Sequence, residues 1–171
     1  MLDLVKPETM RIESRFLEPA CGDGNFLAEV LRRKLIIVKD RYAADFECYA
    51  LLAISTLYGI DILQDNVRAC RERLLRQIDG CTSAYRNTIR CIVSLNIVWG
   101  NTLTLKTSDR KQTLITLPEW SLEKNGMIQR RDHTLSSLLS DSNQTEFLEN
   151  HKPIEYLPVH YLKLGRGYAD A

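Results

Sequence analysis

The sequence predicts an α/β fold in which a mostly parallel sheet is flanked by helices. Three observations lead to this prediction. Short apolar segments alternate with longer amphipathic ones over about residues 12–122, as in parallel strands joined by helices. A Gly-rich turn follows the first apolar segment, as at the end of a buried parallel strand. The dipeptide Asn125-Gly126 then breaks the alternation and predicts a two-residue hairpin turn.

Apolar spacing predicts each element in order. After the first strand, apolar residues from Phe26 to Val38 recur near helical intervals, and Asp65 and Asn66 are candidate caps of a later helix. Thr134 is expected to cap a short helix, and Pro158 restricts the tail to an edge strand. The expected strands are 15–18, 57–62, 96–99, 112–117 and an edge strand within 154–164, and the expected helices are 25–39, 45–55, 63–78, 83–95 and 135–140, with a polar loop over 141–153.

Length and composition indicate one domain over residues 1–171, with a hairpin and irregular tail from residue 123 onward. Apolar residues make up 44% of the chain, but no apolar run approaches the roughly 18 residues of a membrane span. The amino end carries no secretory leader, so a cytoplasmic protein is expected. The 23 Lys and Arg balance 22 Asp and Glu, so the overall charge gives no sign of nucleic-acid binding.

The cysteines and histidines do not predict a metal site or a disulfide framework. Five cysteines are present without a CxxC pair, and the three histidines lie far from any acidic pair with ligand spacing. We therefore expect no metal. Cys21 follows a strand and precedes a helix, and we expect it to pack beneath the turn rather than act as a nucleophile.

The turn itself, "EPACGDGNF" at residues 18–26, predicts a ligand crevice at the carboxyl edge of the sheet. Gly22 and Gly24 let the backbone approach a ligand, and the following helix presents unpaired N–H groups. A phosphate loop of the Walker type is excluded because no Gly-Lys-Ser/Thr sequence follows. A dinucleotide fingerprint fits poorly, because the third small residue is replaced by Leu27 and two carboxylates lie close by.

The segment from Glu18 to Leu27 resembles motif I of the S-adenosylmethionine-dependent DNA adenine methyltransferases. That motif reads acidic residue, Pro-Ala-Cys-Gly, any residue, Gly, often followed by Asn-Phe-Leu. The resemblance covers about residues 1–120 and implies a Rossmann-like methyltransferase fold, incomplete at both ends, that binds S-adenosylmethionine. It is strongest for chains described as restriction-modification methylase subunits. The residues it implies as cofactor ligands within the motif are Glu18, Ala20, Cys21, Gly22, Gly24 and Phe26.

Two later landmarks follow in the order that the family shows. Asp61 ends the second strand, where the family holds a carboxylate against the ribose hydroxyls, and Ile62 would lie against the adenine ring. Asn101, in "WGNTL", occupies the position at which an Asp or Asn of the family hydrogen-bonds the adenine amino group of the cofactor. Either feature alone is also explained by a helix cap or an ordinary turn.

The resemblance fails at the catalytic motif. The family carries Asn/Asp/Ser-Pro-Pro-Tyr/Phe/Trp after the fourth strand. These residues hydrogen-bond the target amino group and stack an aromatic ring on the flipped base. This chain has "PEWS" there, so Glu119 and Trp120 are the candidate catalytic residues, although a packing Trp and an exposed Glu are the favoured interpretation. The upstream Phe-Thr-Pro segment of the family is also missing, and Arg130-Arg131 is expected to be a solvated face rather than a phosphate contact.

The sequence thus leads to two hypotheses of different classes. The first is a methyltransferase-like, S-adenosylmethionine-binding subunit, inactive alone, which would reach DNA through a restriction-modification partner. The second is a non-catalytic module that keeps the pocket or its shell and pairs with another methylase or restriction subunit. Methyl transfer to RNA, protein or a small molecule remains open. Neither hypothesis involves a membrane or a metal.

Overall fold

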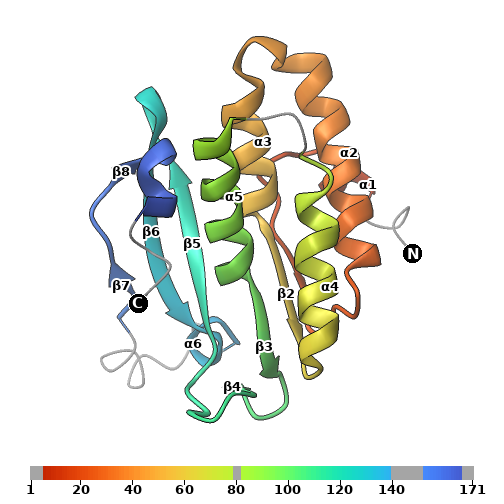
Figure 1. The fold of residues 1–171 in the computed structure, drawn as a ribbon, viewed down its shortest axis with the longest axis vertical. Helices are drawn as coiled ribbons and strands as arrows, with labels where there is room; N and C mark the ends of the chain where they lie inside the picture. The colour runs from red at the N-terminus through yellow and green to blue at the C-terminus, as the bar shows by residue number, and fades with distance from the viewer. Residues whose placement is uncertain (1–5, 79–81, 140–151, 167–171) are drawn as a thin grey trace.

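The computed structural model describes residues 6–78, 82–139 and 152–166. These residues form a mixed α/β structure with a mostly parallel sheet, a layer of helices and a second, antiparallel sheet (Figure 1). The expected α/β class with flanking helices is therefore confirmed. The second sheet is larger than the hairpin that the sequence predicted.

The parallel sheet is formed by strands that end at a common edge. Its order is β1 (Phe16–Glu18), β2 (Leu57–Asp61), β3 (Ile97–Asn101) and β4 (Lys106–Thr107), of which the first three are parallel and β4 turns back antiparallel to β3. The register places Glu18 beside Gly59 and Asp61 beside Trp99. All residues of β2 are buried, as expected for a central parallel strand. This edge positions the candidate site.

Helices cover one face of the sheet (Figure 1). Within the described ranges, the helices of ten or more residues are α2 (Asn25–Arg41), α3 (Phe46–Ser55), α4 (Gln64–Leu75) and α5 (Ser83–Asn96). Their apolar stripes pack in one cluster with Leu57 and Ile97 of the sheet. These helices match the expected segments closely. A short helix α1 (Lys6–Thr9) precedes β1, and a 3₁₀ turn (Ala43–Asp45) precedes α3.

The expected caps of α4 are wrong. Asp65 and Asn66 lie inside its first turn, and Leu63 occupies the cap position without a side-chain cap. The amide of Leu63 donates instead to Oδ1 of Asp61 at 2.8 Å. The sequence misplaced the cap because the capping carboxylate comes from the end of the preceding strand.

The antiparallel sheet is built on the predicted hairpin. It contains β5 (Thr116–Leu122) and β6 (Met127–Thr134), and the tail adds β7 (Ile154–Glu155) and β8 (Val159–His160) against β6. The tail thus contributes two short edge strands on either side of Pro158, where one was expected. The amide of Glu123 donates to Met127 O at 2.7 Å, so the loop is the three-residue 3₁₀ turn Lys124–Gly126 rather than two residues.

The sequence misassigned the fourth strand. Residues 112–117 were expected to extend the parallel sheet, but the strand begins at Thr116 and pairs with β6. In Figure 1, β5 points in the direction opposite to β2 and β3. Ile115, just before β5, lies against Gly100 near the end of β3. Further along β5, Trp120 Nε1 donates to Oδ1 of Asn96, which comes just before β3, at 2.8 Å. Because β4 folds the chain back, this segment covers the face of the sheet away from the helices, where Ile115 and Leu117 pack on Tyr58 and Ile60.

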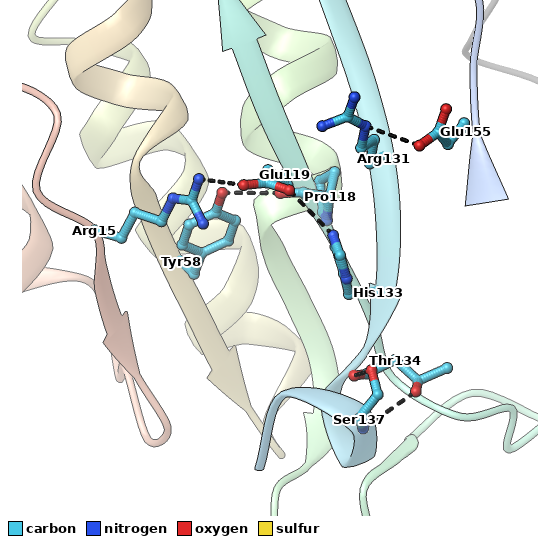
Figure 2. Close-up of polar contacts among 9 residues, drawn as sticks. All are labelled: Arg15, Tyr58, Pro118, Glu119, Arg131, His133, Thr134, Ser137 and Glu155. Atoms are coloured by element: carbon cyan, nitrogen blue, oxygen red, sulfur yellow. Dashed lines mark hydrogen bonds and ion pairs between the residues drawn. The ribbon is translucent and has the colours of Figure 1, made fainter. Parts of the chain in front are cut away.

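The chain after β6 agrees with the sequence where it is described. Thr134 Oγ1 accepts from the Ser137 amide at 3.3 Å, so the predicted cap of α6 (Leu135–Leu139) is confirmed (Figure 2). The last described segment is a 3₁₀ helix (Tyr161–Arg166) that packs on α5, where Thr88 Oγ1 donates to Tyr161 O. Most of the expected loop over 141–153 lies outside the described residues.

Candidate functional site

The Gly-rich turn joins β1 to α2 at the common edge of the parallel sheet. The amide of Cys21 donates to Ile60 O at 2.9 Å, and the amide of Gly24 donates to Cys21 O at 3.0 Å. These bonds fold the turn back onto the end of β2. Gly22 and Gly24 have φ of 53° and 85°, in the left-handed region that favours glycine.

The two glycines of the turn face different surroundings. A Cβ on Gly24 would lie 2.6 Å from Sγ and 3.0 Å from Cα of Cys70, so this glycine is required by close packing against α4. A Cβ on Gly22 would meet no atom within 4 Å. Pro19, Ala20 and Asn25 are exposed as well. The outer side of the turn is therefore open surface, with space for a ligand above Gly22.

Asp61 ties this turn to the start of α4. Its carboxylate is buried, with Oδ2 accepting from the Gly22 amide at 2.9 Å and Oδ1 accepting from the Leu63 amide at 2.8 Å and from Asn66 Nδ2 at 3.1 Å. A carboxylate offers about four acceptor positions. Three are occupied here, so one remains for a hydroxyl group.

The turn after β3 also reaches the Gly-rich turn. Thr102 Oγ1 donates to Pro19 O at 3.2 Å, which places Asn101 at the same edge. Asn101 Oδ1 accepts from the Leu103 amide at 2.9 Å, so its side chain is oriented by its own turn. Among the residues predicted to bind the cofactor, Glu18, the turn, Asp61 and Asn101 thus come from three adjacent strand ends.

The apolar residues predicted for this site have different environments. Ile62 is 57% exposed at the open edge, and its carbonyl accepts from Trp99 Nε1 at 2.9 Å. Phe26 is half-buried and packs edge-on against Phe16, with ring centroids 6.3 Å apart. Ile62 can therefore contact a ligand on the surface, whereas Phe26 contributes mainly to packing beneath the turn.

Asp23 of the turn is paired with an arginine of α4. Arg73 of α4 donates to the Asp23 backbone oxygen at 2.9 Å and to its Oδ2 at 2.6 Å. This clamp holds the turn against α4 and offsets one of the carboxylates near the crevice. No sequence pattern predicts this pair, because the two residues are 50 positions apart.

Cys21 lies under the turn beside Cys70. Both side chains are buried, and the hydrogen bond with Cys70, together with burial, raises the pKa of the Cys21 thiol. A neutral, buried thiol is a poor nucleophile. Cys21 therefore packs the turn, as the sequence indicated.

The structure separates Glu119 and Trp120 from the Gly-rich turn, because β5 runs away from the common edge of β1–β3. Trp120 is buried, and its indole N–H is used by Asn96. Its ring is not available to stack on a base. Glu119 is half-buried and bonds to Arg15 Nη2 at 2.5 Å and to His133 Nε2 at 3.2 Å (Figure 2). The bond from Arg15 lowers the pKa of the Glu119 carboxyl.

The two arginines at 130 and 131 differ from the expected solvated face. Arg130 is largely buried and pairs with the buried Asp132 at 2.6 Å, and its guanidinium lies over the Tyr156 ring. Arg131 pairs with the exposed Glu155 at 3.1 Å (Figure 2). Alternation along β6 sends the two side chains to opposite faces of the sheet, so they do not form one basic patch.

Comparisons with protein-family models, curated proteins and solved structures found no match for this chain. Among the described residues, no group of three or more His, Cys, Asp or Glu side chains could hold a metal ion. No helix in the described part of the chain is both long and apolar enough to cross a membrane. The geometry of the site is therefore the basis for a functional proposal.

Proposed function

We propose that this chain is a methyltransferase-like protein with a Rossmann-like fold that binds S-adenosylmethionine at the Gly-rich turn. In this proposal it is a subunit of the DNA adenine methyltransferase or restriction-modification methylase class. The single observation that carries the proposal is the bond between the Gly22 amide and Asp61 Oδ2, at 2.9 Å. It joins the motif-like turn to the acidic end of the next strand, two features that the sequence placed in the order of the family motifs.

The residues at this edge fit the chemistry of the cofactor. S-adenosylmethionine supplies an electrophilic methyl group on a sulfonium centre and carries an ammonium but no phosphate. Glu18 would receive the ammonium, and the backbone from Ala20 to Gly24 would line the methionine part above Gly22, where space is open. The remaining acceptor position of Asp61 would take one ribose hydroxyl. The exposed Ile62 would lie against the adenine ring, and Asn101 would face its amino group.

The same geometry argues against methyl transfer by the chain alone. Orientation of the flipped base supplies much of the advantage in such a reaction. Trp120 is buried against Asn96, and Glu119 is paired with Arg15 and His133. We therefore propose that catalysis needs a partner subunit, which would also provide the contact with DNA.

A second candidate function is a non-catalytic binding module. The burial of Trp120 favours it, because a residue used for packing is not free to hold a substrate. In this alternative the chain keeps the cofactor pocket, or only its shell, and acts by pairing with another methylase or restriction subunit.

Calorimetric titration with S-adenosylhomocysteine tests the binding proposal. We expect saturable binding with a dissociation constant of roughly 1 μM or higher, because the turn is open surface. This corresponds to a binding free energy of about 8 kcal/mol or less. Gly22→Val points a side chain into the open space and should abolish binding. Gly126→Ala is a control for the effect of a side chain at positive φ, because it lies in the hairpin loop and away from the turn. Equal binding by wild type and folded Gly22→Val would contradict the site.

A methyl-transfer assay with a pool of unmethylated DNA separates the two functions. The purified chain alone should show no incorporation. Incorporation that appears with a partner subunit and is lost in Asp61→Ala supports the methylase subunit. Cofactor binding without incorporation under either condition supports the binding module, and strong transfer by the chain alone would contradict both.

A further inference from the structure

A separate cavity lies on the face of the parallel sheet opposite the layer of helices α2 to α5. Its volume is about 360 Å³, and we call it the outer cavity. Leu17 of β1 and Tyr58 of β2 stand side by side in the register and line it from the sheet. Leu117 of β5 and Leu138 of α6 line it from the opposite side. The walls are thus mainly apolar, and β6 adds His133, so they come from β1, β2, β5, β6 and α6.

The polar groups of this cavity are fixed in position. Glu119 accepts from Arg15 and from His133, so each of its carboxylate oxygens has a partner (Figure 2). Tyr58 donates its hydroxyl to Pro118 O at 2.8 Å and is buried. These contacts join β1, β2, β5 and β6 in one cluster. The cavity is therefore bounded by held side chains rather than by loose surface residues.

Two wall residues are open to the outside. Leu17 is 41% exposed and Leu138 is 52% exposed, although both border an apolar cavity. Large apolar side chains that line a concave site without being covered are a common feature of ligand sites. The body of a ligand that fits here must be apolar.

The charge of the ligand follows from the donors that remain. The Arg15 side chain is 58% exposed and uses one amino group for Glu119. It makes no other hydrogen bond within the described part of the chain, so its remaining N–H groups are available to an acceptor. The negative charge of Glu119 is already balanced within the protein, because its carboxylate accepts from the Arg15 guanidinium and from His133. A single guanidinium beside a carboxylate favours a monoanion over a dianion, because a second negative charge would be repelled.

We propose that the outer cavity binds a small organic carboxylate, with its apolar body between Leu17, Leu117 and Leu138 and its carboxylate on Arg15. A guanidinium matches the planar geometry of a carboxylate and forms charge-assisted hydrogen bonds with it. The site is distinct from the Gly-rich turn, because it lies on the face of β1 and β2 that is opposite the helix layer. It does not depend on the methyltransferase proposal.

The test uses three probes with the full chain: 3-phenylpropionate, the neutral 3-phenylpropanol, and propionate, which lacks the ring. We expect 3-phenylpropionate to bind saturably and to shift the methyl NMR signals of Leu17 and Leu138. The alcohol should bind at least about tenfold more weakly, because it lacks the charge-assisted bond. Propionate should not bind measurably. No saturable binding of the phenyl carboxylate, or shifts confined to the Gly-rich turn, would overturn the proposal.

Variants identify the two halves of the site. Arg15→Gln should lower the affinity for 3-phenylpropionate to that for 3-phenylpropanol and leave the affinity for 3-phenylpropanol unchanged. Arg11→Gln is the matched control, because Arg11 is exposed, pairs with Glu13 and does not line the cavity. If Arg15→Gln fails to fold, Leu138→Ser at an exposed position serves instead, and it should weaken both phenyl probes. Unchanged carboxylate affinity in a folded Arg15→Gln or Leu138→Ser variant would reject the site.

Discussion

The carboxylate of Asp61 accepts a hydrogen bond from the amide of Gly22 at 2.9 Å, across 39 positions of sequence. The other carboxylate oxygen bonds the Leu63 amide and Asn66 at the start of α4. One buried side chain thus holds the Gly-rich turn, the end of β2 and the first turn of α4 together. Any ligand role of Asp61 is added to this structural role.

Asp61→Ala should therefore lower both cofactor affinity and stability. We expect binding of S-adenosylhomocysteine to weaken by about 1.5–3 kcal/mol and the free energy of unfolding to fall by about 1–3 kcal/mol. Asn66→Ala is the control, since it removes one bond to Asp61 on the helix side only. It should cost stability but leave affinity unchanged. Calorimetry measures affinity and urea unfolding measures stability. A loss of stability without a loss of affinity in Asp61→Ala would leave Asp61 with a structural role alone.

Gly24 and Gly22 should respond differently to the same substitution. Gly22→Ala adds a methyl group in open space and costs only the backbone strain of a positive φ, about 1–2 kcal/mol. Gly24→Ala adds the same strain and also forces the methyl group against the sulfur and the backbone of Cys70. We expect a clearly larger loss of unfolding free energy for Gly24→Ala. Equal losses in denaturant titrations would show that the turn can move away from α4.

Lys34 predicts a pH dependence of stability. Its buried ammonium donates to Ile12 O at 2.9 Å, to Ser14 O at 2.5 Å and to Thr56 Oγ1 at 2.6 Å, and burial lowers its pKa to about 7. In the unfolded chain the pKa of Lys is about 10.4, so between these values the unfolded state binds more protons. Stability contributed by Lys34 should rise with pH in this range, by up to about 1.4 kcal/mol per unit.

The comparison for Lys34 is with Lys34→Met, which has no titrating group at this position. Removal of the ammonium takes a hydrogen-bond donor from Ile12 O, Ser14 O and Thr56 Oγ1 and should be destabilising at every pH. The gap in unfolding free energy between wild type and Lys34→Met should be wider at pH 9 than at pH 6. A gap that stays flat or narrows as pH rises would contradict the lowered pKa.

Trp120→Phe tests whether this residue packs or acts on a ligand. The change keeps an aromatic ring but removes the indole N–H and leaves Oδ1 of the buried Asn96 without its donor. We expect a loss of about 1–3 kcal/mol in unfolding free energy. Affinity for S-adenosylhomocysteine should not change in the folded variant. A loss of affinity with normal stability, measured on the same preparation, would place Trp120 in the binding machinery.

The two ion pairs of β6 should differ in energy. Asp132→Ala removes the carboxylate that pairs with the largely buried Arg130 and should cost about 3–5 kcal/mol. Glu155→Ala breaks the more exposed pair with Arg131 and should cost less than about 1 kcal/mol. Thermal unfolding of the two variants measures the contrast. Similar small losses in both would mean that Arg130 reaches water when Asp132 is removed.

Sequence patterns over a few neighbouring residues were sufficient to predict the helices and turns whose formation depends on those residues alone. Helix periodicity located α2 and α5, the glycines located the turn after β1, and Asn125-Gly126 located the hairpin. The cap by Thr134 is equally local. In each case the residues that decide the structure lie within a few positions of one another, so the sequence displays them directly.

The sequence alone therefore determined the α/β class, the Gly-rich turn and the residues gathered at the edge of the parallel sheet. Only the tertiary structure decided the path of β5, since the short reversal at β4 directs that strand across the sheet instead of into it. That path buries Trp120 and brings Glu119 to Arg15, 104 positions away. Such contacts depend on which face of the sheet needs apolar cover, and this is settled when the whole core packs, not by the local order of residues.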